Sequence, residues 1–111
     1  MEMENKELTE RIRQKNFFRN NGMVLKGINM LRTQYVRLTD LRYALEPSLS
    51  ESELLDSINY LTEGGYINTR NCRTKQEITL ADCPFDELEA KVSHEGIQII
   101  ACTRTDPCID V

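Results

Sequence analysis

The stretch SESELLDSINYLTEGGYI, residues 50–67, constrains the fold of this chain more than any other segment. It opens with a capping box, because the Ser50 hydroxyl and the Glu53 carboxylate can each accept a hydrogen bond from an amide that the start of a helix leaves unpaired. Gly64 or Gly65 then supplies the left-handed residue that commonly ends a helix. The apolar residues between these two signals recur at helical spacing and predict one narrow buried face: Leu54, Leu55, Ile58 and Leu61.

Two helices are predicted before this segment. Residues 4–20 have the composition of an exposed amphipathic helix, and residues 20–22 (NNG) form a weak break after it. A second helix with one buried apolar stripe is expected over residues 23–33.

A short strand and a short helix are predicted next. Residues 35–38 (YVRL) are β-prone and too few to form more than an edge strand. Thr39 is a suitable N-cap for a helix over residues 40–46, and Leu38 and Tyr43 are spaced to form a hydrophobic staple around that cap. The proline after this helix ends it, because proline cannot continue a helix.

A β-hairpin and a last helix follow the capped segment. Residues 66–70 and 87–92 have the composition of two strands, and residues 71–86 carry mixed turn and polar signals that indicate a long tip. Ser93 can cap a last helix, which ends before the Asp-Pro pair near the C-terminus.

Length and charge bound the class of the protein. A chain of 111 residues without low-complexity tracts is expected to form one domain around one modest core. No apolar stretch approaches the roughly 20 residues needed to cross a bilayer, and the acidic start does not resemble a secretory signal, so we expect a cytoplasmic protein without membrane contact.

The net charge of −4 is uneven, since residues 1–49 hold nine Lys/Arg against six Asp/Glu and residues 50–111 hold five against twelve. Any contact with nucleic acid must therefore come from local basic patches.

The order of the predicted elements is that of a winged helix-turn-helix domain. The stretches LRYALE, LLDSINYLTEGGYI and LEAKVSHEGIQIIACTRTDPCI make the chain resemble the small winged-helix proteins of Mu-like phages and prophages. In those proteins a threonine-x-x-glycine-isoleucine motif begins the last helix, and an aspartate-proline-glycine-isoleucine motif forms the tail. Here Ser93 stands in place of the threonine and Cys108 in place of the glycine.

This resemblance implies an α+β, mainly helical fold in three parts. Residues 1–21 would be an N-terminal helical extension, residues 22–92 the winged helix-turn-helix core, and residues 93–111 a C-terminal helix and tail. The resemblance also implies a phage or prophage protein, and it brings no catalytic site.

DNA-binding transcriptional regulation is the leading function that such a fold implies. The helix after Ser50 would be the recognition helix, which lies in the major groove of double-stranded DNA. Its outward face is poorly suited to that role, because no Lys or Arg occurs between Arg42 and Arg70 while several acids do. The residues of this helix that could still touch bases or phosphates are Ser52, Asp56, Ser57, Asn59 and Tyr60.

The best basic cluster lies at the start of the hairpin and consists of Arg70, Arg73 and Lys75. A mobile wing could bring these side chains to the minor groove or to the flanking phosphates. Arg37 and Arg42 could add contacts to the DNA backbone. The same could hold for bases of the N-terminal helix: Arg11, Arg13, Lys15 and Arg19. The alternative is that all of these are solvated surface charges.

A protein-interaction module without DNA binding is the alternative function. An apolar stripe on the N-terminal helix, formed by Leu8, Ile12, Phe17 and Phe18, could build a homodimer or bind a phage or host protein. The opposite charges of the two halves would suit a contact between the basic segment of one copy and the acidic segment of another. The stripe could instead fold back on the core of its own chain.

No enzyme activity and no cofactor are expected. His94 is the single histidine, and none of the common phosphate-binding, metalloprotease or nucleophile motifs occurs. The cysteines are expected to be free thiols, since they show no C-x-x-C spacing; a zinc site, with or without His94, and a disulfide are the alternatives. These cysteines are Cys72, Cys83, Cys102 and Cys108.

Overall fold

The first helix, α1 (Glu2–Asn29), is one uninterrupted helix of 28 residues. The predicted break at residues 20–22 is therefore wrong, and so is the predicted end near Thr33. Asn20 and Asn21 are buried, and their side chains donate to Glu53 Oε2 at 3.1 Å and to the Cys108 carbonyl at 3.0 Å. These tertiary contacts replace the local turn that two asparagines and a glycine would otherwise favour.

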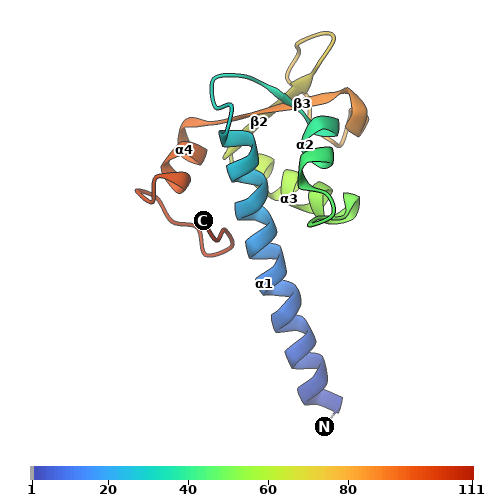
Figure 1. Cartoon of the computed structure of the whole chain (residues 1–111), viewed down its shortest axis with the longest axis vertical. Helices are drawn as coiled ribbons and strands as arrows, with labels where there is room; N and C mark the ends of the chain where they lie inside the picture. The colour runs from blue at the N-terminus through green and yellow to red at the C-terminus, as the bar shows by residue number, and fades with distance from the viewer. Residues whose placement is uncertain (1) are drawn as a thin grey trace.

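The computed structural model describes residues 2–111, with side-chain surroundings from residue 5 onward (Figure 1). Over that range the fold is α+β and mainly helical, with four α-helices and a small antiparallel sheet. The elements after α1 are β1 (Val36–Arg37), α2 (Leu38–Leu45), α3 (Glu51–Glu63), β2 (Ile67–Asn71), the 3-10 helix η1 (Phe85–Glu87), β3 (Leu88–Val92) and α4 (His94–Ile100).

The sheet has the strand order β1-β3-β2, so the last strand lies between the other two. Val36 pairs with Ala90 on one side of β3, and Thr69 pairs with the same residue on the other. The edge strand β1 has two residues, which agrees with the short strand predicted from YVRL. Leu88, Ala90 and Val92 of β3 belong to the hydrophobic core, so helices cover the face of the sheet on which these three residues lie.

Helix α2 begins before its predicted cap. Leu38 is its first residue and Arg37 holds the N-cap position without a capping side chain, so the prediction of Thr39 as the cap is wrong. The predicted staple is also absent, because Leu38 is fully buried while Tyr43 is 82% exposed. No polar side chain caps the N-terminus of α2, so the burial of Leu38 in the core determines where the helix starts.

Helix α3 forms as its sequence predicts. The Ser50 hydroxyl accepts from the Glu53 amide at 3.1 Å, and the Glu53 carboxylate accepts from the Ser50 amide at 3.0 Å. This reciprocal pair confirms the capping box. Gly64 ends the helix with right-handed backbone angles, and Gly65 supplies the left-handed residue with φ of 77°.

One hydrophobic core joins all of these elements. Its fully buried members come from α1, α2, α3, β3 and α4 and include Leu25, Leu38, Ile58, Leu88 and Ile99. Helix α1 packs against α3 through its C-terminal half, which is where its buried residues lie. The N-terminal half of α1 extends away from the other elements (Figure 1).

The long hairpin tip turns back onto the core in its second half. Ile78, Leu80 and Phe85 pack against core residues, and Cys83 is buried. Residues 73–77 are exposed and form the turn, which Figure 1 shows as the yellow loop beyond β2. Only the first half of the predicted tip is therefore a projecting loop.

The C-terminal tail crosses α1 at the level of the predicted break. The Asp110 amide donates to the Phe18 carbonyl at 3.1 Å, and Ile109 is buried in the core. A Cβ at Gly22 would collide with the Asp110 carbonyl, so this helix position admits only glycine while the tail is docked.

Ser93 caps α4 as predicted, because its hydroxyl accepts from the Gly96 amide at 3.1 Å. Within the described residues, no helix has the length and apolar content to cross a membrane.

Candidate functional site

The three predicted wing bases are each bound to an acid of the hairpin. Arg70 Nε lies 2.8 Å from Glu89 Oε1, and Lys75 Nζ lies 3.0 Å from the same oxygen. Arg73 forms an ion pair with Glu87. The structure thus brings the predicted cluster together, but with its positive charges opposed by carboxylates that the sequence analysis had assigned only to the returning strand.

Glu89 is the centre of this cluster because its side chain is only 8% exposed. Burial alone would raise the pKa of its carboxyl, but the hydrogen bonds from Lys75 and Arg70 outweigh burial and hold the pKa below its ordinary value of 4.5. Arg70 is fixed a second time, since its guanidinium lies 3.6 Å from the centre of the Tyr35 ring. A cation stacked on an aromatic ring and bonded to a buried carboxylate has little freedom to contact a ligand.

The outward face of α3 is smaller than the sequence predicts. Ser52, Asp56 and Asn59 are exposed, as expected. The prediction that Ser57 and Tyr60 face outward is wrong, because Ser57 is fully buried and Tyr60 packs edge-on against Phe17 with ring centres 5.4 Å apart. Packing of α1 against α3 takes both positions into the interface between the two helices.

The hairpin tip also lies beside the C-terminal half of this face. A small cavity of about 50 Å³ separates Thr79 and Leu80 from Asn59 and Glu63. A larger hollow of about 510 Å³ lies next to it, between Leu55 and Phe85. Asn59 is therefore exposed but lies beside the hairpin tip, with which it lines both hollows.

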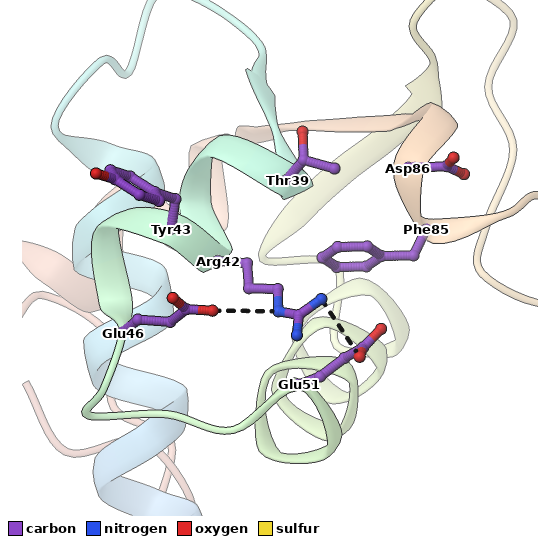
Figure 2. Close-up of a pocket in the computed structure, with 7 residues that line it drawn as sticks. All are labelled: Thr39, Arg42, Tyr43, Glu46, Glu51, Phe85 and Asp86. Atoms are coloured by element: carbon purple, nitrogen blue, oxygen red, sulfur yellow. Dashed lines mark ion pairs between the residues drawn. The ribbon is translucent and has the colours of Figure 1, made fainter.

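A cleft lies between α2, the start of α3 and η1, and we refer to it as the α2–α3 cleft (Figure 2). Its volume is about 470 Å³. Figure 2 shows the Arg42 guanidinium between two carboxylates, at 3.5 Å from Glu46 and 3.3 Å from Glu51, with the Phe85 ring pointing toward it. The cleft is lined by Thr39, Arg42, Tyr43, Glu46, Glu51, Phe85 and Asp86.

The α2–α3 cleft is therefore acidic and aromatic. Its lining holds one base, Arg42, against three acids. Arg37, the other base predicted to contact a DNA backbone, donates from Nη2 to the Asp86 carbonyl at 2.8 Å and so ties β1 to η1. Arg42 is thus paired with two carboxylates, whereas the exposed Arg37 is held by a backbone carbonyl and keeps its positive charge.

A hydrogen-bonded group around Asp106 was not predicted from the sequence. Its carboxylate accepts from Tyr66 at 2.6 Å, from Tyr60 at 2.8 Å and from the Cys108 amide at 2.8 Å. The hydrogen bond to Asp106, with burial, raises the pKa of Tyr66 to about 12, and burial with the same acceptor raises the pKa of Tyr60. The Asp-Pro pair marks this turn in the sequence, but the tyrosines lie at least 40 residues away and nothing local links them.

The predicted apolar stripe of α1 is divided between two faces. Leu8 and Phe17 are nine residues apart, about two and a half helical turns, so they point in opposite directions. Phe17 lies against Tyr60, whereas Leu8 and Ile12 are 58% and 52% exposed. The prediction of one stripe is therefore wrong, and only Leu8 and Ile12 form a free apolar face.

The cysteines are free thiols in the structure, and among the described residues no three His, Cys, Asp or Glu side chains are grouped to hold a metal ion. Comparison of this chain with protein-family models, with curated proteins and with solved structures finds no match. Three features of the described residues could carry a function: the ion-paired hairpin cluster, the α2–α3 cleft and the free face of α1.

Proposed function

We propose that this chain is a winged-helix protein that acts by binding another protein through the α2–α3 cleft. The element order α1, β1, α2, α3, β2, β3 and the sheet order β1-β3-β2 support a winged helix-turn-helix core over residues 22–92. The resemblance to the small winged-helix proteins of Mu-like phages and prophages supports the same fold. In it, α3 takes the place of the recognition helix and the β2–β3 hairpin that of the wing.

The observation that carries the proposal is the pairing of every predicted wing base with an acid. DNA that drew Arg70 or Lys75 away from Glu89 would leave that almost fully buried carboxylate without its partners. A buried charge that loses its partners costs several kcal/mol, about as much as several phosphate contacts return. The hairpin therefore offers DNA little net attraction.

The outward side of α3 adds repulsion. Asp56 and Glu63 are exposed on it, and Glu51 lies at its start. These carboxylates would face phosphates if α3 entered a major groove, and no base of α3 opposes them. A surface of this sign favours a basic partner instead.

The α2–α3 cleft has the groups that bind a Lys or Arg side chain of a protein. Carboxylates form charge-assisted hydrogen bonds with ammonium and guanidinium groups, and aromatic rings attract the same cations. Glu46 and Glu51 are both paired with Arg42, but their side chains are about half exposed, and such exposed ion pairs are weak and can be exchanged for a cation of a partner. Tyr43 is 82% exposed at the rim. The partner class is accordingly a basic segment of a phage or host protein.

Two titrations followed by fluorescence anisotropy test the proposal. One uses a labelled random-sequence duplex at low salt, and the other a labelled helical peptide rich in Lys and Arg. We expect the peptide to bind with strong salt dependence and the duplex not to bind. Glu51→Lys should weaken peptide binding, and Glu10→Lys, at an exposed position outside the cleft, should leave it unchanged. Tight binding of the duplex without binding of the peptide would contradict the proposal.

DNA-binding regulation is the second candidate function, and one observation favours it. The projecting half of α1 carries exposed bases that could follow a DNA backbone: Arg11, Arg13, Lys15 and Arg19. If the duplex binds, replacing these four residues by Ala should abolish binding, whereas the triple replacement of Arg70, Arg73 and Lys75 should change it little. If the triple replacement abolished binding and the replacement of the four α1 residues did not, the hairpin rather than α1 would be the DNA contact.

A further inference from the structure

The projecting part of α1 is a helix without a partner in its own chain. Every residue from 5 to 15 is exposed, which corresponds to about 16 Å of helix, and of these residues Arg13 lines a hollow with Glu53 and Asp56 of α3 (Figure 1). Isolated helices of this length are marginal in water, so a helix of this kind normally gains stability from contact with another surface. The question is which surface its chemistry fits.

One side of this segment is both apolar and basic. Leu8 and Ile12 lie one turn apart, and Arg11 and Lys15 follow Leu8 by three and seven residues, which places them on the same side of the helix. Glu7 lies 4.0 Å from Arg11, in a pair with both side chains about 70% exposed. Such a pair is weak and is easily exchanged for another. We call this side the Leu8–Ile12 face and define it by Leu8, Arg11, Ile12 and Lys15.

We propose that the Leu8–Ile12 face docks in the α2–α3 cleft of a second copy of this chain. The inference rests on the proposed function, because it uses the same cleft, and it names the partner. Arg11 and Lys15 would meet Glu46 and Glu51 of the partner subunit, and Leu8 and Ile12 would cover the aromatic rings at the cleft. Each contact would thus join either opposite charges or two apolar surfaces.

Docking within one chain is excluded by the continuity of α1. The helix runs without a break from Glu2 to Asn29, and its C-terminal half is fixed in the core by Val24, Leu25 and Ile28. Residues 5–15 therefore point away from the globular part and can reach the cleft of their own chain only if the helix breaks. A second copy needs no such change.

Each copy offers one helix face and one cleft, so two copies can satisfy both contacts reciprocally about a two-fold axis. The contact area of an 11-residue helix face is small for a permanent dimer, even when doubled. The product is therefore a reversible dimer whose population depends on protein concentration and on salt.

Sedimentation velocity of the full chain over a range of concentrations tests this inference. The helix variant is Arg11→Glu/Lys15→Glu, and the cleft variant is Glu46→Lys/Glu51→Lys. Each alone should weaken self-association by about tenfold or more, because like charges then face each other. An equimolar mixture of the two should associate again, since the acidic helix of one variant meets the basic cleft of the other. Lys26→Glu/Arg32→Glu carries the same change of charge elsewhere and should associate as the unaltered chain does.

Circular dichroism checks that each variant is folded. If the cleft variant is not folded, Tyr43→Ser replaces it, because that ring is 82% exposed and its loss does not disturb the core. An unaltered chain that stays monomeric at every concentration, or a mixture that fails to associate, would overturn the inference. A monomeric chain that still binds the basic peptide would overturn self-docking and leave the proposed function standing, whereas a chain that binds only the duplex would overturn both.

Discussion

Arg70 on β2 and Glu89 on β3 are directly opposite each other in the antiparallel sheet, and Arg70 Nε lies 2.8 Å from Glu89 Oε1. Lys75 donates to the same oxygen at 3.0 Å. One buried carboxylate thus binds two of the three bases that the sequence presents as a DNA-binding wing. The pairing explains how a hairpin with several bases can have a surface that is close to neutral.

Replacing Glu89 by Gln should lower the free energy of unfolding by about 1–3 kcal/mol, because it leaves two cations without their anion beside a buried amide. Urea denaturation at neutral pH measures the change. Glu77→Gln, an exposed position in the same hairpin, should change stability by no more than about 0.5 kcal/mol. Equal effects of the two substitutions would show that the cluster does not stabilise the fold.

Acid should destabilise the protein through Glu89 and Asp106. Burial alone would raise the pKa of each carboxyl, but hydrogen bonds outweigh it and both pKa values are lowered in the folded state. Their contribution is then complete above the unfolded-state pKa, near 4.5 for Glu89, and is lost as the pH falls through the folded-state pKa. Stability measured from neutral to acidic pH should decline below about pH 5, and Glu89→Gln should flatten that decline. A profile that is the same in the variant would contradict the assignment to Glu89.

Asp106→Asn should bring the pKa of Tyr66 down from about 12 toward its ordinary value of 10.0. The charged acceptor is what favours the protonated phenol, and the amide that replaces it carries no charge. Because the folded-state pKa of Tyr66 is raised, this group contributes stability below pH 10 that is lost as the pH rises through the folded-state value. Ultraviolet titration of the phenols measures the shift, with Asp110→Asn as the control on the same tail. An unchanged titration would mean that the carboxylate does not control Tyr66.

Gly22→Ala should release the C-terminal tail. Alanine favours a helix interior by up to about 1 kcal/mol over glycine, but its Cβ would collide with the Asp110 carbonyl. Hydrogen exchange of the Asp110 amide, which donates to the Phe18 carbonyl, should accelerate. Gly27→Ala is the matched control, because its Cβ would meet only the Leu41 Cδ1 at 3.0 Å. A more stable Gly22→Ala chain with slow exchange at Asp110 would contradict the docking of the tail.

Ser57→Ala should stabilise the protein by about 1 kcal/mol. The Ser57 hydroxyl is buried between α1 and α3 without a hydrogen-bond partner among the described residues, so its removal ends a desolvation cost and also favours the helix. Thermal or urea unfolding measures the gain, and Ser52→Ala, exposed on the same helix, serves as the control. A loss of stability would show that the hydroxyl has a partner in solution.

Elements with local signals were predicted well. The capping box of Ser50 and Glu53, the cap at Ser93 and the left-handed Gly65 each depend on atoms within a few residues, and all three are confirmed. The starts of α3 and α4 follow from them. The prediction from local signals fails at residues 20–22. There the residue types favour a turn, but hydrogen bonds to the tail and to α3 stabilise a continuous helix instead.

The sequence by itself determined the α+β class, the position of α3, the acidic sign of its outward face and the absence of any base on it, because these depend on residue type and short-range spacing. Only the tertiary structure decided that Arg70, Arg73 and Lys75 are paired with Glu87 and Glu89. It likewise decided that Ser57 and Tyr60 are turned inward and that Leu8 and Ile12 are exposed on a continuous helix. Each of these depends on contacts between residues far apart in the chain, and such contacts are fixed by the packing of α1 against α3 and of β2 against β3.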